Sequence, residues 1–400
     1  MNPPWLAILG IGEDGALTPT AETLLANAVL VVGGERHLAL ADRLIRGDRS
    51  TWSSPMDRTL ADIAARRPAP VAVLASGDPY WFGAGATLAR HVPVAETQCI
   101  PAPSAFTLAC AALGWALQDC VTLSFCGRAF GPLLPALQPG ARILALSADA
   151  DTPAAVAALV AARGFGPSRL WILEALGGPG HRIRTSSAAG FDMDGVHPLN
   201  MVAIEVAAAP GAQVIPLASG LPDDAFEHDG QLTKREIRAV TLSTLAPRRG
   251  QVLWDVGCGS GSVGIEWCLR HPANQAIGID GGRDRAARAR RNAAALGTAL
   301  QVVDGSAPGA LAGLMQPDAV FIGGGAADPG VIDAAWDALP PDGRLVANAV
   351  TIETEAALLA ARARLGGTLT RLSVERLDRI GAMHGYRPAM TVTQWLAVKP

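Results

Sequence analysis

The sequence predicts two α/β domains joined in tandem, and three observations lead to this fold class. The chain has 400 residues, of which 50% are hydrophobic, which is enough for two cores of roughly 200 residues each. In both halves, short runs rich in β-branched residues alternate with Ala- and Leu-rich stretches, as in α/β proteins. Between the halves, a segment containing Pro and Gly interrupts this alternation. We therefore predict a first domain at 1–211, a linker at 212–224 and a second domain at 225–400.

The first half contains apolar runs that end in Gly, Ser or Asp turns and are separated by helical stretches. Helices are predicted after Thr18 and from Ser104, where Ala- and Leu-rich stretches follow. The predicted strands of this domain are 6–12, 29–34, 71–78, 121–125, 142–147, 169–175 and 201–207.

The second half has the same rhythm, but its last two predicted strands follow each other without a helix between them. This order favours a doubly wound, Rossmann-like sheet that ends in an antiparallel edge hairpin. The predicted strands are 251–259, 276–280, 299–305, 318–325, 343–349, 368–378 and 390–399.

Charge and cysteine usage exclude several classes of function. The 33 basic and 36 acidic residues give a net charge of −3, which provides no general field for nucleic acid or an anionic membrane. The six cysteines form no CxxC pair and no Cys/His cluster, so we expect no metal site. No apolar stretch of about 18 residues and no signal peptide are visible, so we expect a cytoplasmic protein without a membrane partner.

A glycine-rich loop, DVGCGSG at 255–261, follows the first predicted strand of the second domain. Such a loop lets backbone amides approach a ligand at a helix N-terminus, and Asp280 at the end of the next strand is placed to bind ribose hydroxyls. A nicotinamide-binding dehydrogenase is the alternative for a loop of this kind. The acidic residue two positions before the first glycine and the G-x-G-x-G spacing resemble motif I of class I S-adenosylmethionine-dependent methyltransferases instead.

That resemblance implies how the second domain holds S-adenosylmethionine. Asp255 fixes the loop, the glycines line the methionine and ribose, and the VDGSAP turn at 303–308 lies beside the adenine. Methyltransferases often have Asp or Glu at the position of Ser306, so this contact departs from the usual pattern. The implied cofactor-binding residues are Thr233, Asp255, Gly257, Cys258, Gly259, Ser260, Gly261, Asp280, Ser306 and Ala307.

Four further strings narrow the resemblance to one family. They are GLPDDAF at 220–226, TKREIR at 233–238, FIGGG at 321–325 and ANAVTIETE at 347–355. Together they resemble the C-terminal, decarboxylating module of the precorrin-6Y C5,15-methyltransferase family over about residues 219–400. Thr233 has a plainer alternative role as the N-cap of the following helix.

Three strings in the first half resemble the tetrapyrrole methylase (class III methyltransferase) family. They are GIGEDGALT at 10–18, SGDPYWFG at 76–83 and IPAPSAFTLACAALG at 100–114. The resemblance implies a two-lobed domain with a second cofactor pocket, although each string alone is also an ordinary turn. The implied cofactor-binding residues here are Gly10, Gly12, Ser76, Gly77, Asp78, Pro79, Ser104 and Ala105.

Arginines are the candidates for binding the carboxylates of a tetrapyrrole, because a guanidinium donates two parallel hydrogen bonds. In SFCGR at 124–128, Cys126 stands where the C5-methylating family tends to have His, and we expect it to be a pocket or core residue. Arg182, Arg184, Arg376 and Arg379 are additional candidates. The predicted substrate-binding residues are Arg36, Arg128, Gly324, Gly325 and Arg387.

The family resemblance implies S-adenosylmethionine-dependent methylation of precorrin-6B at carbons 5 and 15, with decarboxylation of the ring C acetate, to give precorrin-8X. It implies carbon 5 methylation by the first domain, and carbon 15 methylation and decarboxylation by the second, with two cofactor sites per chain. A sulfonium methyl group is already activated, so its transfer mainly requires placement, whereas decarboxylation also requires control of a proton. The candidate catalytic residues for that step are His384, Tyr386, Glu353 and Asn348.

Two alternatives remain open from the sequence. The arginine-rich helix RDRAARARR at 283–291 suits phosphates, as in an RNA methyltransferase. The first domain can also be a non-catalytic scaffold that binds the cofactor without acting on substrate. The family resemblance further suggests a homo-oligomer, with a tetramer as the candidate state.

Overall fold

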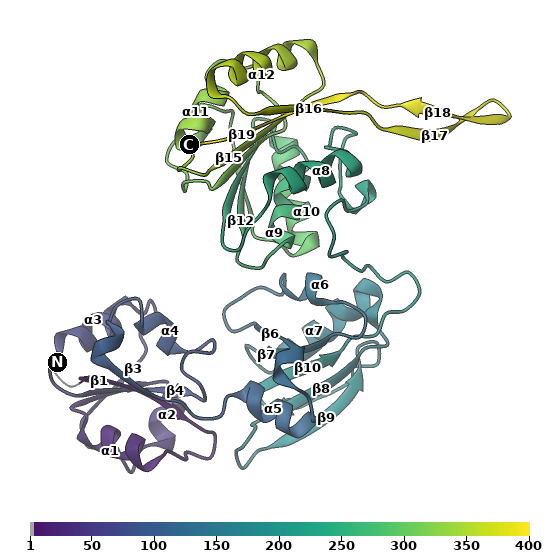
Figure 1. Ribbon diagram of the computed structural model, residues 1–400. Coiled ribbons are helices and arrows are strands. Elements are labelled where there is room, and N and C mark those ends of the chain that lie inside the picture. The colour runs from purple at the N-terminus through teal and green to yellow at the C-terminus, as the bar shows by residue number, and fades with distance from the viewer. Residues whose placement is uncertain (1–3) are drawn as a thin grey trace. The chain divides into compact units, whose positions relative to one another are not determined.

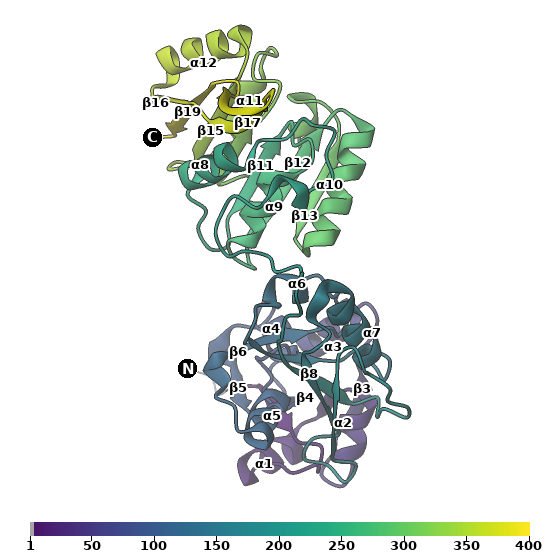
Figure 2. The same ribbon diagram turned by 90° about the vertical axis from the view of Figure 1, so that its right-hand side faces the viewer.

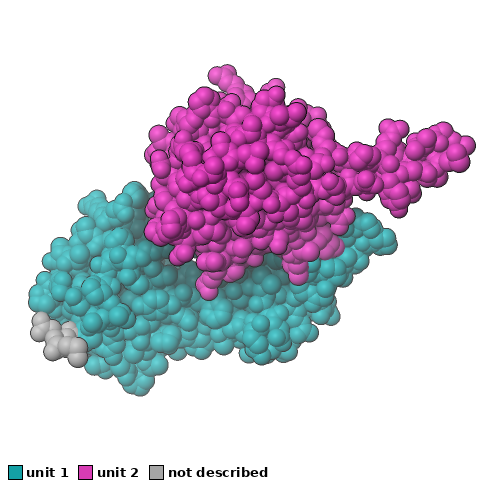
Figure 3. Space-filling view, turned by 45° about the horizontal axis from the view of Figure 1, so that its top comes forward, with its two compact units in different colours: residues 1–129, 136–213 teal, residues 130–135, 214–400 magenta. Residues whose placement is uncertain are grey.

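A computed structural model of the chain describes residues 4–400 and divides into two compact units. The first unit extends to Ala129 and continues from Ala136 to Gln213, and the second comprises Val214–Pro400 with Phe130–Pro135. The two units are coloured separately in Figure 3. Both are mixed α/β structures, which confirms the predicted fold class.

The first unit begins with a parallel five-stranded sheet of order β3-β2-β4-β1-β5. Apolar residues of α1 and α2 pack on one face of this sheet, and residues of α3 and α4 pack on the other (Figure 1). Both faces are therefore covered, as a parallel sheet requires. The elements are β1 (Leu6–Ile11), α1 (Pro19–Asn27), β2 (Leu30–Gly33), α2 (Glu35–Leu40), β3 (Asp48–Thr51), α3 (Asp57–Ala65), β4 (Val71–Ser76), α4 (Ala84–Leu88) and β5 (Thr97–Ile100).

A second five-stranded sheet, of order β6-β7-β10-β8-β9, forms the other lobe of the first unit and is mostly antiparallel. The two-lobed architecture agrees with the tetrapyrrole methylase expectation. Strands β3, β5 and β9 were not predicted, because none of them has a run of buried apolar residues. The elements are α5 (Ala105–Leu113), β6 (Cys120–Ser124), α6 (Leu133–Ala136), β7 (Arg142–Leu146), α7 (Thr152–Val160), β8 (Arg169–Glu174), β9 (Arg182–Ser187) and β10 (Asn200–Glu205).

The second unit contains a seven-stranded sheet of order β13-β12-β11-β14-β15-β19-β16, in which β19 is antiparallel to both of its neighbours. Helices α8, α9 and α10 cover one face (Figure 2), and α11 and α12 cover the other. The elements are α8 (Arg235–Leu245), β11 (Val252–Val256), α9 (Ser262–Leu269), β12 (Gln275–Asp280), α10 (Arg283–Leu296), β13 (Leu300–Asp304), β14 (Ala319–Ile322), α11 (Val331–Ala338), β15 (Arg344–Ala349), α12 (Ile352–Leu365), β16 (Thr368–Leu372) and β19 (Val392–Val398).

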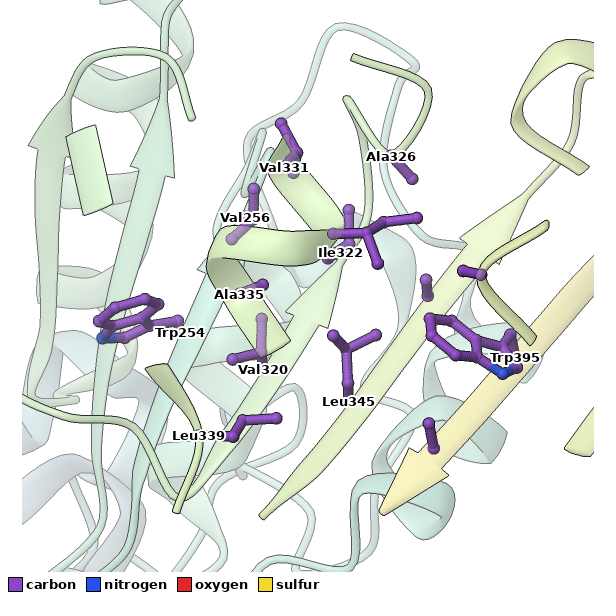
Figure 4. Close-up of a cluster of buried hydrophobic side chains, with 14 of the residues drawn as sticks. Trp254, Val256, Val320, Ile322, Ala326, Val331, Ala335, Leu339, Leu345 and Trp395 are labelled. Carbon is purple, nitrogen blue, oxygen red and sulfur yellow. The ribbon is translucent and has the colours of Figure 1, made fainter. Parts of the chain in front are cut away.

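The core of the second unit lies between the sheet and helices α11 and α12. Trp254 and Trp395 bracket aliphatic side chains such as Val320 and Leu345, which are fully buried (Figure 4). Close packing of this core fixes the positions of the strands, and it therefore also fixes the loops that follow their carboxyl ends.

The prediction of one strand over 368–378 is wrong. Strand β16 ends at Leu372, and β17 (Glu375–Ile380) pairs with β18 (Met383–Pro388) in a separate hairpin that extends from the second unit (Figure 1). The physical reason is that segment 375–379 (ERLDR) contains four ionisable residues, which favour solvent over the interior of a sheet. All residues of this segment are exposed. His384 and Tyr386 therefore lie in strand β18 of this hairpin.

Among residues 4–400, no helix is both long enough and apolar enough to cross a membrane. In the same part of the chain, no group of three or more His, Cys, Asp or Glu residues has the arrangement of a metal site.

Candidate active sites

The turn after β11 has a backbone conformation that requires glycine. Gly257, Gly259 and Gly261 have φ values of +68°, +55° and +76°, a region that disfavours side chains. A Cβ atom on Gly257 would lie 2.8–2.9 Å from backbone atoms of Gly324, in the turn after β14. The DVGCGSG and FIGGG strings are therefore two turns in close contact at the same edge of the sheet.

Two buried aspartates hold the first of these turns. The Asp255 carboxylate accepts a hydrogen bond from the Gly264 amide at 2.9 Å, and Asp280 accepts one from the Gly259 amide at 2.9 Å. Asp280 also accepts hydrogen bonds from the Gly282 amide at 2.8 Å and from Arg285 Nε at 3.0 Å.

Burial raises the pKa of Asp255 to about 7, with a smaller rise from the charge of Asp280 and an opposing effect from the Gly264 amide. Because an unfolded Asp has a pKa of about 3.9, the folded state binds this proton more tightly. Asp255 therefore opposes folding increasingly as the pH rises from about 4 to 7. The DVGCGSG loop therefore retains a buried carboxyl group that lowers the stability of the fold near neutral pH, as is typical of functional sites.

These turns border a cavity of about 920 Å³, which lies within the usual range for small-molecule sites. Among residues 4–400, no His, Glu or Tyr lines it, so the titratable groups at its wall are aspartates, one thiol and three cations. Burial raises the pKa of that thiol, Cys258, above its usual range. The predicted residues that line the cavity are Thr233, Asp255, Gly257, Cys258, Gly259, Asp280, Ser306, Ala307, Gly324, Gly325 and Asn348.

Six predicted residues of the second domain are absent from this cavity wall. Ser260 and Gly261 continue the turn behind it, and Glu353 lies exposed in the first turn of α12. The hairpin carries His384, Tyr386 and Arg387, and Arg387 pairs with Asp378 at 3.0 Å. The structure therefore does not bring the four predicted catalytic residues together within this chain. His384 and Tyr386 lie in the hairpin, beyond the point where the chain leaves the sheet, and only Asn348 lines the cavity.

A segment before α8, here called the strap (220–234), forms one wall of the cavity through Gly230–Lys234. Its start is anchored by Glu266, which is fully buried and accepts hydrogen bonds from the Gly220 amide at 2.7 Å and the Leu221 amide at 2.9 Å. Glu266 also pairs with the buried Arg238 at 2.6 Å. This ion pair was not predicted from the sequence. The available signal was that Arg238 in α8 and Glu266 in α9 are charged residues on the buried, otherwise mostly apolar faces of their helices.

The structure rejects the N-cap role of Thr233. Lys234 is the N-cap residue of α8 and makes no side-chain capping hydrogen bond, whereas the Thr233 carbonyl accepts a hydrogen bond from Arg238. Thr233 is therefore held at the cavity by its backbone.

Asn348 is oriented by two buried residues that sequence reasoning also missed. Its Nδ2 donates to Thr241 Oγ1 at 3.0 Å, and its Oδ1 accepts from Gln394 Nε2 at 2.9 Å. Gln394 Nε2 also donates to Thr241 Oγ1 at 3.1 Å, and Gln394 Oε1 accepts from Thr244 at 2.8 Å. The network leaves one N–H group and one oxygen lone pair of the Asn348 amide for a ligand.

The arginines of α10 are engaged with carboxylates. Four of them pair with acidic residues at 2.6–3.0 Å, which leaves no free basic stripe for phosphates on this described helix and does not support the RNA-binding alternative. The pairs are Arg285–Asp280, Arg288–Asp229, Arg290–Asp304 and Arg291–Glu227.

The first unit has a smaller cavity, of about 90 Å³, at the carboxyl ends of β1 and β4 and beside β7, β8 and β10. The predicted residues that line it are Gly12, Arg36, Ser76, Gly77 and Ala105.

The other predicted residues of this domain have structural partners. A Cβ atom on Gly10 would collide with the Gly77 carbonyl and lie 2.5 Å from the Ala102 amide, so Gly10 in β1 allows the segments after β4 and β5 to approach this strand closely. Ser104 caps α5 by accepting a hydrogen bond from the Thr107 amide at 3.2 Å. Asp78 accepts a hydrogen bond from the Tyr80 amide, Pro79 lies against Gly83 and Gly85, and the Arg128 guanidinium lies 5.1 Å from the Phe82 ring centroid.

Two expectations for the second lobe are corrected. Arg182 and Arg184 both bind the buried Glu174, at 2.8 and 2.9 Å, so they clamp a carboxylate of the protein itself. Burial acts to raise the pKa of Glu174, but hydrogen bonds from both arginines and the His197 amide lower it to about 2. Cys126 is exposed and donates to the Ser147 carbonyl at 3.3 Å, so it is neither a core residue nor part of the cavity wall.

A polar cluster at the first cavity joins the ends of three neighbouring strands. Glu13 follows β1, Arg36 and His37 begin α2 after β2, and Ser76 ends β4. Arg36 Nη1 pairs with Glu13, and Arg36 Nη2 lies 3.0 Å from Ser76 Oγ. His37 Nε2 lies 2.8 Å from the same hydroxyl and 3.0 Å from Arg36 Nη2. Sequence reasoning selected Arg36 and Ser76 but placed them in different roles.

Comparison with known proteins bears on both sites. Residues 6–192 match the family model for tetrapyrrole (corrin/porphyrin) methylases, and residues 224–399 match the model for the precorrin methyltransferase domain. A relative from Sinorhizobium sp. named precorrin-6Y C(5,15)-methyltransferase [decarboxylating] is 55% identical over 98% of this chain and 96% of its own length. The chain belongs to the precorrin-6Y C5,15-methyltransferase family.

Two shorter relatives, each of which matches about half of this chain, are named for methylation at only one of the two carbons. A Salmonella typhimurium protein named cobalt-precorrin-7 C(5)-methyltransferase is 32% identical over 50% of this chain and 98% of its own. A Pyrobaculum calidifontis protein named probable cobalt-precorrin-6B C(15)-methyltransferase (decarboxylating) is 37% identical over 44% of this chain and 95% of its own.

Proposed function

We propose that this chain is an S-adenosylmethionine-dependent, decarboxylating C-methyltransferase of cobalamin biosynthesis. It methylates precorrin-6B at carbons 5 and 15 and removes the ring C acetate carboxyl group, giving precorrin-8X. The observation that carries the proposal is the cavity of about 920 Å³ built on the DVGCGSG turn, in a chain that matches a relative of this name almost from end to end.

The residues of the second cavity fit S-adenosylmethionine. The glycine turns present backbone without side chains, and Asp280 keeps lone pairs beyond its three protein hydrogen bonds for ribose hydroxyls. The bound cofactor supplies a sulfonium methyl group. The protein then has to align the ring carbon with that group and exclude water, and buried apolar residues of the cavity wall such as Phe321 and Val331 favour this.

We propose that decarboxylation takes place in this second cavity. Its wall offers Arg376 and Lys234 as cations for the carboxylates of the ring, and Asn348 as an oriented amide. Arg376 also pairs with Glu236, which holds its charge at the cavity wall.

We propose a second S-adenosylmethionine site in the first unit, which methylates carbon 5. Its support is the set of Gly- and Pro-containing turns around the smaller cavity. A volume of about 90 Å³ is below that of ordinary ligand sites, so the lobes or the loop at 77–83 have to move to admit a nucleoside. Domain limits of 1–211 and 225–400, with a linker at 212–224, are consistent with the unit boundary after Gln213.

Replacing Asp280 with alanine should remove the ribose anchor of the second site only. Titration calorimetry with S-adenosylhomocysteine should show two sites per chain in the wild type, and weakening of one of them by about 1–3 kcal/mol in the variant, the cost of leaving polar partners unpaired. At limiting cofactor, the variant given precorrin-6B should accumulate a singly methylated product that retains its acetate carboxyl group, detected by mass spectrometry.

The matched control is Asp333→Ala, which removes an exposed carboxylate of α11 that lies outside the cavity wall. It should bind and react as the wild type does. Normal release of carbon dioxide by the Asp280 variant, together with failed methylation at carbon 5, would mean that the domain roles are reversed. One site in the wild type would favour the scaffold alternative.

We also propose that the chain forms a homo-oligomer through the β17–β18 hairpin. A two-stranded hairpin is marginally stable alone, and this one exposes Leu377, Ile380, Met383 and Tyr386 by 53–74%. Leu377 and Tyr386 lie opposite each other on one face of the hairpin, and Ile380 and Met383 lie on the other, so a second copy packed on either face would bury one of these pairs. Changing Leu377 and Met383 to serine should reduce the mass measured by light scattering to that of one chain, and an unchanged mass would place the interface elsewhere.

A further inference from the structure

Four polar side chains, those of Glu13, Arg36, His37 and Ser76, form a hydrogen-bonded cluster at one edge of the first sheet. All four follow parallel strands at their carboxyl ends, the edge where α/β sheets bind ligands. Glu13, Arg36 and Ser76 line the smaller cavity directly, whereas His37 lies behind Ser76 and contacts it through Nε2.

The hydrogen-bond directions in this cluster follow from its chemistry. A guanidinium has only donors and a neutral imidazole nitrogen has one lone pair, so the 3.0 Å contact of Arg36 Nη2 with His37 Nε2 fits an unprotonated Nε2 whose lone pair the Ser76 hydroxyl shares. Arg36 Nη2 also donates to Ser76 Oγ, so the Ser76 hydroxyl proton points to Nε2 at 2.8 Å. The result is a hydroxyl at the cavity wall that donates to a neutral imidazole.

His37 is kept in this neutral state. Burial, and secondly the positive charge of Arg36, lower the pKa of His37 to about 4. The other ring nitrogen, Nδ1, is buried and has no hydrogen-bond partner in the part of the chain that the structure describes. A buried polar group left without a partner costs stability, so its retention calls for a functional reason.

We propose that Ser76 and His37 form a proton relay that receives the proton released by the ring after methyl transfer in the first unit. This inference rests on the proposed methylation by that unit. The ring carbon gives an electron pair to the methyl group, the carbon–sulfur bond breaks, and its electron pair remains on sulfur. The positive charge passes to the ring, which then loses one proton to Ser76 Oγ as the hydroxyl proton moves to His37 Nε2.

The Glu13–Arg36 ion pair reduces the electrostatic cost of protonating His37, which burial and the neighbouring Arg36 charge raise. The Glu13 carboxylate neutralises the guanidinium, so the cluster has no net charge before the proton arrives and a single positive charge afterwards. Arg36 in turn holds both Ser76 and His37 in place through Nη2. Arg36 is therefore a positioning residue, and Ser76 is the group that touches the substrate.

The test uses the full chain, precorrin-6B and S-adenosylmethionine, with products resolved by mass spectrometry. His37→Gln keeps a polar side chain beside Ser76 but cannot accept the proton, so carbon 5 methylation should lose about 100-fold in kcat, the scale of general base catalysis. KM for the substrate, binding of S-adenosylhomocysteine and release of carbon dioxide should stay within about threefold. A purely structural role would raise KM or abolish cofactor binding instead.

Ser76 provides a second, independent arm, because it is exposed at the cavity and its replacement does not disturb the core. Ser76→Ala should show the same loss in kcat, and Ser76→Thr, which keeps the hydroxyl, should retain most of the rate. His91→Gln, at an exposed histidine of the same unit, is the control and should react as the wild type does.

Three outcomes overturn these conclusions: the first two concern the relay, and the third concerns the proposed function of the first unit. A wild-type rate in His37→Gln overturns the relay, and so does equal loss of activity in Ser76→Thr and Ser76→Ala. A wild-type chain that fails to methylate carbon 5 while it methylates carbon 15 overturns the proposed function of the first unit.

Discussion

Replacing Glu266 with alanine should destabilise the second unit by about 3–5 kcal/mol, the usual cost of leaving a buried charge without its partner. The substitution removes the buried carboxylate that pairs with the fully buried Arg238, leaving only the partly exposed Asp223 at 3.2 Å, and it also removes the acceptor for the Gly220 and Leu221 amides. Urea unfolding followed by tryptophan fluorescence measures the change, since Trp267 lies next to the substituted residue on α9. The two units can unfold separately, so the transition of the second unit is the one compared.

The same variant should bind S-adenosylhomocysteine more weakly at the second site. Glu266 anchors the start of the strap, and the strap ends in the cavity wall at Gly230–Lys234. The matched control is Arg291→Ala, which breaks an exposed ion pair with Glu227 of the same strap and should cost far less. Equal destabilisation by both substitutions would show that burial of the Glu266–Arg238 pair does not matter.

Replacing Gly257 with alanine should weaken cofactor binding at the second site by at least about tenfold. A left-handed conformation costs an alanine roughly 1–2 kcal/mol, and about 1.4 kcal/mol corresponds to a factor of ten in affinity. Gly257 has a φ of +68°, and its new Cβ would lie 2.8–2.9 Å from the backbone of Gly324, so the two turns must also separate. Calorimetry with S-adenosylhomocysteine measures this loss, with the first site as an internal reference.

The control for this substitution is Gly309→Ala. Gly309 lies in the same unit and does not have a positive φ, and a Cβ atom added there would meet no described atom within 4 Å. This variant should bind the cofactor as the wild type does. If Gly257→Ala binds equally well, close approach of the two turns is not required for the site.

The second cavity could be predicted from sequence because its parts lie at strand ends. The carboxyl ends of parallel strands meet at one edge of a sheet, so Asp255, Asp280 and Ser306 had to come together once three strands were recognised. The glycines carried their own signal, since DVGCGSG encodes a backbone conformation that is local to the turn. The two-domain organisation followed from the alternation of apolar runs in the same way.

Side-chain pairing between distant elements was not predictable. Arg238 and Glu266 are 28 residues apart, His37 and Ser76 are 39 apart, and Asn348 meets a residue 46 positions away. Each pairing depends on which faces of two helices or strands oppose each other. A single sequence reports hydrophobic period and turn chemistry, but it does not report the register between packed elements.

The sequence by itself therefore determined the two α/β domains, the family, and the cofactor turn with its acidic residues, because these depend on local backbone requirements and on topology. Only the tertiary structure decided that residues 375–388 leave the sheet as a hairpin, that Arg182 and Arg184 serve Glu174, and that His37 stands behind Ser76. The reason is physical: burial of a charge or hydroxyl is tolerated only where a partner is packed against it, and packing is a property of the whole domain.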